Sequence, residues 1–274
     1  MSDFVKPTKF LNKILDKKRE TIKKEFIGVS SNDLRYEAFE IRKNSSPHRL
    51  FNKLQNSEKT NIIAEFKRIS PSKGTINADA NPEKTAGNYL RGSAAAISVL
   101  TEKDFFGGSI NDLKLVVQSI EDRIPVLCKD FILDERQIFQ AAIAGASVIL
   151  LIVAAFETHQ IEQLINLHNF AENLGLDALV EVHTIGEMKI AEEIGSKVIG
   201  VNNRNLQTFE VTLESSEKLI SFAPQNAILI SESGIKTRED IVRLEKVGYK
   251  GFLIGETLMR AENIEKALID LIGD

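Results

Sequence analysis

Eight short apolar segments recur at fairly regular spacing along the chain, and this recurrence restricts the fold more than any other feature. Most of the segments are unbroken rather than alternating, which is typical of strands buried on both faces of a parallel sheet. They span residues 61–66, 94–100, 124–129, 147–153, 177–182, 197–202, 227–232 and 251–255. The chain is therefore expected to contain eight parallel strands.

Segments with helical periodicity lie between the apolar runs, and three of them, residues 134–144, 185–194 and 238–247, are each followed by a glycine that ends a helix. Eight strand–helix units in 274 residues favour an α/β fold, a closed (β/α)8 TIM barrel. The alternative is an open doubly wound sheet, which usually carries GxGxxG after its first strand. Here the first strand is followed by SPSKG.

The first 58 residues are predicted to form a helical extension that precedes the barrel of residues 59–274, within one domain spanning residues 1–274. One helix is indicated by apolar residues three and four positions apart between Phe10 and Phe26, and a short second helix by Arg49 to Leu54. We expect these helices to cover one end of the barrel. A structural cap and a substrate lid are both consistent with the pattern.

Composition limits the compartment and the class of partner. The net charge of −4 argues against a nucleic-acid binder, so the Lys17-Lys18-Arg19 cluster is interpreted as a solvated helix face. One cysteine and four histidines without ligand spacing predict no metal site, and the histidines are expected on the surface or in ordinary packing. The start MSDFVKPTKF lacks a signal-peptide core, and residues 148–156, the longest apolar run, are too few to cross a bilayer. A cytoplasmic protein without membrane contact is expected.

Charged and polar residues fall at the carboxyl ends of the predicted strands, where barrels of this class hold their active sites. A single charged residue there would be interpreted as an ion pair that closes the barrel. Several ionisable groups at one rim shift each other's pKa values, as acid–base catalysis requires. The candidate catalytic residues are Glu65, Lys67, Lys129, Glu181, Asn202 and Glu232.

A phosphate group is expected at the loops that follow the last two strands, because backbone N–H groups and glycines allow close approach there. Each glycine alone is a weak signal, since glycine commonly forms a turn after a strand. The candidate phosphate ligands are Ser233, Gly234, Gly255, Glu256, Arg204 and Ser70.

With these residues placed, the sequence strongly resembles the indole-3-glycerol-phosphate synthase family of tryptophan biosynthesis over nearly its whole length. The segment IAEFKRISPSKG resembles the family's signature, and KDF, EVH, NNRNL, ESGI and LIGETLM follow in the family's order. The resemblance implies a carboxy-lyase that closes the ring of 1-(2-carboxyphenylamino)-1-deoxyribulose 5-phosphate. Its products are indole-3-glycerol phosphate, CO2 and water.

The resemblance also implies roles for the candidates. Lys129 is the expected general acid, Glu181 the general base of dehydration, and Lys67 the group that holds the leaving carboxylate. Glu65 is expected to orient a lysine and stabilise the cationic ring, while Asn202 and Glu232 position sugar hydroxyls. No metal or organic cofactor is needed, and other enzymes of the pathway are possible partners.

An anthranilate ring also needs an apolar pocket, for which the candidates are Phe106, Phe131, Leu150, Leu206 and Ile254. Core packing is an alternative for each of them and equally favoured for Leu150. Two positions depart from the family's pattern. Cys128 is expected to pack toward the helices, and the Glu256 side chain suits phosphate poorly, which leaves only its backbone N–H.

Two rival functions share part of this pattern. Another phosphate-binding barrel, such as phosphoribosylanthranilate isomerase, pairs a cysteine base with an aspartate acid, but the only cysteine here is expected to point away from the mouth. A non-catalytic barrel that binds a phosphorylated metabolite would keep the glycines and lose the charged rim. This chain has both features.

Overall fold

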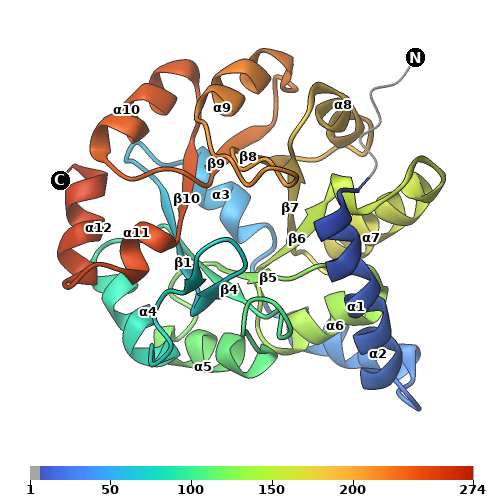
Figure 1. Ribbon diagram of the computed structural model, residues 1–274. Helices are drawn as coiled ribbons and strands as arrows, with labels where there is room; N and C mark the ends of the chain where they lie inside the picture. The colour runs from blue at the N-terminus through green and yellow to red at the C-terminus, as the bar shows by residue number, and fades with distance from the viewer. Residues whose placement is uncertain (1–6, 274) are drawn as a thin grey trace.

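The computed structural model describes residues 7–273 and shows a closed barrel of parallel strands surrounded by helices (Figure 1). The order around the barrel is β1-β10-β9-β8-β7-β6-β5-β4, and every neighbouring pair is parallel. The predicted (β/α)8 fold is confirmed. The barrel strands are β1 (Ile62–Phe66), β4 (Ala96–Leu100), β5 (Val126–Lys129), β6 (Val148–Ile152), β7 (Asp177–Val182), β8 (Val198–Asn202), β9 (Ile228–Glu232) and β10 (Gly251–Ile254).

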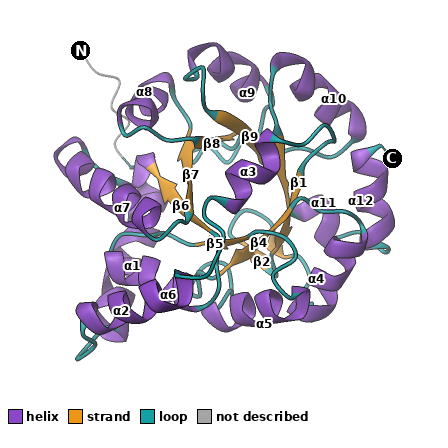
Figure 2. Ribbon diagram, turned by 180° about the vertical axis from the view of Figure 1, so that it is seen from behind, coloured by secondary structure: helices purple, strands orange, loops and turns teal. Residues whose placement is uncertain are grey.

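Helices that follow the strands surround the barrel (Figures 1 and 2). They are α4 (Pro82–Arg91), α5 (Ile110–Ile120), α6 (Glu135–Ile143), α7 (Ile161–Asn173), α8 (Ile185–Glu193), α9 (Glu214–Leu219), α10 (Arg238–Val247), α11 (Glu256–Met259) and α12 (Ile264–Ile272). Three short 3-10 helices are η1 (Val153–Ala155), η2 (Thr158–Gln160) and η3 (Ile220–Phe222).

Local sequence explains where these helices begin and end. Asp134, Thr184 and Thr237 accept hydrogen bonds from the first turns of α6, α8 and α10, which satisfies backbone N–H groups that have no partner within the helix. Gly248, just past α10, has a φ of 116°, a conformation that glycine adopts without strain. The three predicted helices are confirmed, with ends within a residue of those expected.

The N-terminal extension contacts both ends of the barrel, so the expectation that it covers one end is wrong. It comprises α1 (Lys9–Glu25), α2 (Ser31–Arg42) and α3 (Arg49–Gln55), of which α2 was not predicted. At the amino ends of the strands, the Asp177 carboxylate of β7 accepts hydrogen bonds from the Leu50 and Phe51 backbone N–H groups. Figure 2 shows α3 across this opening of the barrel. In contrast, α1 lies at the carboxyl ends of the strands.

The attachment of α1 corrects a second expectation. Lys18 does not lie on a solvated face, because its side chain is only 9% exposed and its Nζ lies 2.5 Å from Asp130 Oδ1. Asp130 follows β5 directly and also accepts a hydrogen bond from the Thr101 hydroxyl at 2.9 Å. Burial lowers the pKa of Lys18, but Asp130 outweighs this effect and the net shift is upward. A buried ion pair therefore fixes α1 beside the last residue of β5.

A small antiparallel ribbon in the loop after β1 was also not predicted. It pairs β2 (Ile69–Ser70) with β3 (Gly74–Thr75) and lies over the barrel in Figure 1. Arg68 fixes the start of this loop, because its guanidinium makes two hydrogen bonds to the Asp112 carboxylate of α5. The loop that carries Ser70 is thus attached to the neighbouring strand–helix unit.

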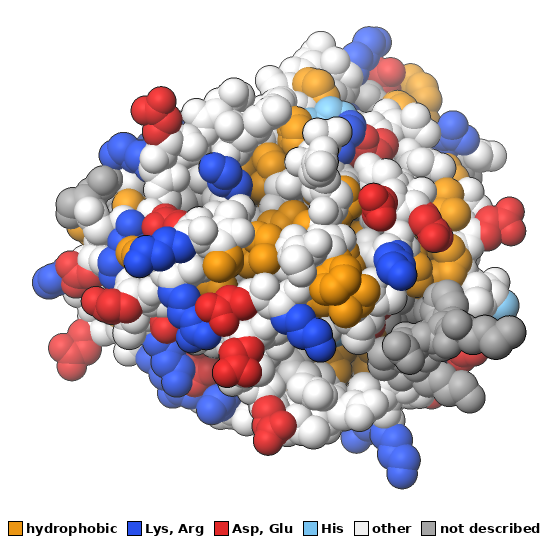
Figure 3. Space-filling model, turned by 90° about the horizontal axis from the view of Figure 1, so that it is seen from above, with side chains coloured by type: hydrophobic (Ala, Val, Ile, Leu, Met, Phe, Trp, Pro, Cys, Tyr) orange, Lys and Arg blue, Asp and Glu red, His pale blue; other side chains and the backbone are white. Residues whose placement is uncertain are grey.

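The surface seen in Figure 3 carries acidic and basic side chains intermixed, with hydrophobic side chains between them. This mixture agrees with the small net charge of −4. Within residues 7–273, no helix is long and apolar enough to cross a membrane. The absence of a signal peptide was predicted from MSDFVKPTKF, and residues 1–6 of this segment lie outside the described part of the chain.

Candidate active site

All the predicted site residues line one cavity of about 760 Å³ at the carboxyl ends of the strands. Strand register brings them together, because residues that end neighbouring parallel strands lie side by side. Asn202 of β8 pairs with Glu232 of β9, and Glu181 of β7 pairs with Gly200 of β8. The size of the cavity suits a small metabolite.

Lys129 at the end of β5 is the centre of a buried charge cluster. Its Nζ lies 2.8 Å from Glu232 Oε2 and 3.3 Å from Glu181 Oε2. Burial lowers the pKa of Lys129, but the two carboxylates and Glu65 raise it more, so the group stays protonated. Burial and the neighbouring Glu181 raise the pKa of Glu232 to about 7. A proton donor and carboxylates of unequal acidity therefore lie within one small volume.

Glu65 and Lys67 form an ion pair at the end of β1. Glu65 lies in the barrel interior, and its backbone carbonyl accepts a hydrogen bond from the Tyr89 hydroxyl of α4 at 2.9 Å. Gly255, after β10, leaves room for the Glu65 carboxylate, because a Cβ at this position would overlap Glu65 Oε1. Lys67 is more exposed than Glu65 and lines the cavity.

Glu181 has partners on both carboxylate oxygens. Oε1 accepts a hydrogen bond from Asn202 Nδ2 at 3.0 Å and lies 3.4 Å from His183 Nε2, while Oε2 faces Lys129. Burial raises the pKa of Glu181, but Lys129 and His183 outweigh it and the net shift is downward. Asn202 Oδ1 in turn accepts a hydrogen bond from the backbone N–H of Arg204. Glu181 is therefore held as an ionised carboxylate.

The loops after β9 and β10 form the other end of the cavity. Ser233 and Gly234 have φ values of 69° and 85°, a left-handed turn that costs Ser233 strain. The Arg204 guanidinium contacts the Phe209 carbonyl, and the Ser70 and Ser72 hydroxyls lie 3.2 Å apart. Three further cations line this region: Lys73, Lys236 and Arg260.

The Glu256 carboxylate faces the Arg260 guanidinium at 3.1 Å. This side chain is thereby paired with a cation, and a phosphate contact of its backbone N–H stays a prediction.

The apolar side of the cavity contains Phe106 and Phe131, whose ring centroids are 6.2 Å apart. Leu150, Leu206 and Ile254 also line it, as do Phe10, Leu11 and Ile14 of α1. The helical extension thus contributes directly to the cavity wall. Sequence periodicity predicted the helix, but it could not show which side of the barrel the apolar face of α1 covers.

The position of His183 was missed as well. It was expected on the surface or in ordinary packing, yet its side chain is only 12% exposed and contacts Glu181. The i, i+2 spacing from Glu181 was the available signal, because such residues share one face of a strand. Cys128 is buried outside the cavity lining, and burial raises the pKa of its thiol to about 12.

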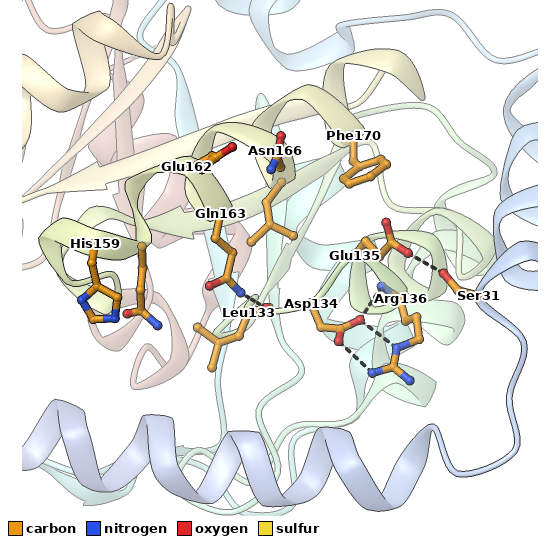
Figure 4. A pocket seen from close by; sticks show the side chains of 12 residues that line it. Ser31, Leu133, Asp134, Glu135, Arg136, His159, Glu162, Gln163, Asn166 and Phe170 are labelled. Carbon is orange, nitrogen blue, oxygen red and sulfur yellow. Dashed lines mark hydrogen bonds and ion pairs between the residues drawn. The ribbon is translucent and has the colours of Figure 1, made fainter.

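A second cavity of about 660 Å³ lies between α6 and α7 and contains none of the predicted site residues (Figure 4). Its polar side chains are largely paired with each other, as Asp134 is with Arg136 and Glu135 with Ser31. No group of three or more histidine, cysteine or acidic residues that could hold a metal ion occurs within residues 7–273.

A family model described as indole-3-glycerol phosphate synthase matches residues 11–271. The chain belongs to the indole-3-glycerol phosphate synthase family. The family and activity expected from the sequence, a decarboxylating lyase of tryptophan biosynthesis, are confirmed. The match begins within α1 and ends within α12, so it includes the extension and the barrel.

Curated relatives carry the same name. An indole-3-glycerol phosphate synthase of Lactococcus lactis subsp. lactis is 46% identical over 79% of this chain and 81% of its own. One from Listeria monocytogenes is 49% identical over 77% and 82%. One from Oceanobacillus iheyensis is 42% identical over 93% and 94%.

Solved structures at low identity support the fold alone. A 3-hexulose-6-phosphate synthase from Salmonella typhimurium has a TM-score of 0.62 at 13% identity and covers 78% of this chain and 97% of its own. A thiamine phosphate pyrophosphorylase from Pyrococcus furiosus has a TM-score of 0.58 at 18% identity, with coverages of 81% and 95%.

Proposed function

We propose that this synthase converts 1-(2-carboxyphenylamino)-1-deoxyribulose 5-phosphate at the cavity above β5, β7 and β9, with Lys129 as general acid and Glu181 as general base. The observation that carries this assignment is the position of Lys129 between Glu181 and Glu232. A lysine held protonated between two carboxylates of unequal acidity has both a proton to deliver and neighbouring groups through which to recover it.

Substrate orientation follows from the opposite ends of the cavity. The phosphate is bound at the loops of Ser233, Gly234 and Gly255, with Arg204 and Ser70 adding contacts and Glu256 offering its backbone N–H. The anthranilate ring lies between Phe106 and Phe131, over Leu150, Leu206 and Ile254, and against the apolar face of α1. Lys67 faces the ring carboxylate, and Asn202 and Glu232 position the sugar hydroxyls.

Ring closure forms a carbon–carbon bond between the ring carbon that bears the carboxylate and the ketone carbon. Lys129 donates its proton to the ketone oxygen, which becomes a hydroxyl. Glu65 and Glu232 stabilise the positive charge that develops on the ring. Loss of CO2 then leaves its bonding electron pair in the ring system and removes that charge.

Dehydration completes the indole. Glu181 accepts a proton while a lysine donates one to the leaving hydroxyl, so that one water molecule departs and the new double bond makes the five-membered ring aromatic. Glu181 is suited to this step because Asn202 and His183 hold its carboxylate in one orientation.

The isomerase alternative needs a cysteine base at the mouth. The buried Cys128 thiol lies outside the cavity lining and has a raised pKa, and both features disfavour that role. A purely metabolite-binding barrel would gain nothing from a buried cluster of unlike charges, which costs free energy to desolvate.

We place the enzyme in the cytoplasm, where its phosphorylated substrate is expected, and propose no nucleic-acid partner because the surface charge is mixed and the net charge is negative. Association with other enzymes of tryptophan biosynthesis remains a proposal that co-purification would test.

The test of the proposed function is incubation of the purified protein with the carboxyphenylamino sugar phosphate while indole fluorescence is recorded. The chain has no tryptophan, so its own emission in that window is small. A rising signal that Lys129→Met abolishes is the expected result. Full turnover by Lys129→Met would overturn the assignment of the acid.

A further inference from the structure

His183 is a buried titratable group that exchanges no proton with the substrate in the proposed catalytic steps. It follows β7 directly, two residues after Glu181, and its ring lies between two carboxylates. Nε2 is 3.4 Å from Glu181 Oε1, and Nδ1 is 3.2 Å from Glu187 Oε2. Glu187 belongs to the first turn of α8 and is itself buried.

The position of Glu187 is fixed independently of the imidazole. Its Oε2 accepts the His183 backbone N–H at 2.7 Å, and its own N–H donates to the Thr184 hydroxyl at 3.2 Å. The first turn of α8 is therefore attached to the end of β7, and the His183 ring is held between the two carboxylates.

A neutral imidazole does not fit this arrangement. It has one N–H and one nitrogen lone pair, whereas ionised carboxylates only accept hydrogen bonds. The tautomer with hydrogen on Nδ1 turns the Nε2 lone pair toward Glu181, and the other tautomer turns the Nδ1 lone pair toward Glu187. Only the imidazolium presents an N–H to each carboxylate. His183 Nε2 makes no hydrogen bond within residues 7–273, and its contact with Glu181 Oε1 at 3.4 Å is that of an ion pair.

The charge balance of the site supports the same conclusion. Glu65 pairs with Lys67, while Glu181 and Glu232 share Lys129. When Lys129 gives its proton to the substrate, that shared cation is lost. The remaining cation beside Glu181 is His183, which Glu187 faces from α8 and Glu232 approaches from β9.

We infer that His183 is an imidazolium that holds the proposed base Glu181 ionised and oriented throughout the reaction, with Glu187 as its anchor. His183 is a positioning residue, because it acts on the substrate only through Glu181. The inference rests on the proposed function, in which Glu181 accepts a proton. Burial lowers the pKa of His183, but Glu187 and Glu181 outweigh it and the net shift is upward.

The kinetic test compares the pH profiles of kcat/KM for the wild type, His183→Asn, His183→Gln and Glu187→Gln from about pH 3 to about pH 8, because the pKa of Glu181 lies below its ordinary value of 4.5. The base must be ionised, so activity falls as the pH drops through the pKa of Glu181. Loss of the imidazolium raises that pKa, and the acid limb of His183→Asn moves upward by about one pH unit, a tenfold loss on the acid side. Glu187→Gln should move the limb in the same direction by a smaller amount.

The matched control is His168→Asn. His168 is also buried, but it lies on α7, outside the cavity, and burial lowers its pKa. Its replacement should leave the acid limb in place. A uniform loss at every pH in His183→Asn, with an unshifted limb, would show a structural role only and overturn the inference.

A second measurement does not depend on turnover or on the folding of any variant. The imidazole nitrogens of wild-type protein labelled with ¹⁵N-histidine report protonation directly, and the chain has only four histidines to assign. Both His183 nitrogens are expected to carry protons near neutral pH. A neutral His183 would refute the inference even if Glu181→Gln proves inactive, whereas full activity of Glu181→Gln with a charged His183 would refute the proposed base instead.

Discussion

The two ends of the barrel both bury charge, but they satisfy it in different ways. At the amino ends of the strands, Asp177 accepts two backbone N–H groups of α3. There Arg42 also donates to the Leu174 and Gly175 carbonyls. At the carboxyl ends, Lys129 forms ion pairs with Glu181 and Glu232, and all three residues line the cavity.

This difference separates structural charge from catalytic charge. At the amino ends, the hydrogen-bond partners of Asp177 are backbone N–H groups, which cannot change protonation, although His48 Nδ1 also lies 3.6 Å from its Oδ1. The partners at the mouth are themselves titratable, and Glu232 Oε1 has no hydrogen-bond partner within residues 7–273. Burying titratable groups beside each other lowers the stability of the fold, but it gives neighbouring side chains different pKa values.

The largest expected effect is the loss of turnover in Lys129→Met. Removing the proposed general acid should reduce kcat on the order of a thousandfold. The measurement is indole fluorescence with saturating substrate. Unchanged binding of inorganic phosphate is the control, because the proposed phosphate loops follow β9 and β10. A reduction that merely tracks the unfolded fraction would contradict the role.

Lys18→Met tests the ion pair between Lys18 and Asp130. This contact lies at the carboxyl ends of the strands but is expected to serve stability, as the contacts at the amino ends do. The change leaves the buried Asp130 without its cation and should lower the free energy of unfolding by roughly 3 kcal/mol. Because α1 lines the cavity, KM should rise as well. Chemical denaturation and steady-state kinetics measure the two effects, with the exposed Lys17→Met as control. Equal stability of the two variants would show that Lys18 does not anchor α1.

Glu181→Gln removes the proposed general base at the carboxyl ends of the strands. The amide keeps the shape of the side chain but cannot accept a proton, so kcat should fall on the order of a hundredfold with little change in KM. A rise in KM at constant kcat would instead assign Glu181 to substrate binding.

Asp177→Ala should lower stability without lowering kcat, and its effect should be the smallest of these four variants. It leaves the Leu50 and Phe51 N–H groups without their acceptor and should cost about 2 kcal/mol of stability. The cavity is at the other end of the barrel, so kcat should be unchanged at temperatures where the variant is folded. A fall in kcat of the folded variant would show that the two ends are not independent.

Sequence predicted the parts of the molecule that depend on local pattern. All eight barrel strands, the glycine stops and the charged strand ends are visible in periodicity and spacing, because strand register alone brings those ends together. The contacts of the N-terminal extension could not be predicted in this way. The apolar pattern of α2 is weak, and no local pattern shows that α1 and α3 contact opposite ends of the barrel. Lys18 was misjudged because its partner Asp130 is distant in sequence, so only the tertiary structure reveals their contact. His183 was misjudged although its spacing from Glu181 was visible in the sequence.

The central claim, that charge at the mouth serves chemistry at the expense of stability, is tested most directly by Glu232→Gln. The folded-state pKa of Glu232 is about 7, above its ordinary value of 4.5, so its contribution to stability is present below about pH 4.5 and lost as the pH rises through about 7.

The measurement is the free energy of unfolding of the wild type and Glu232→Gln at about pH 5 and about pH 8, together with turnover. Relative to the wild type, the variant should gain at most about 3 kcal/mol between these conditions while its kcat falls. A variant that becomes less stable than the wild type as the pH rises would contradict the account.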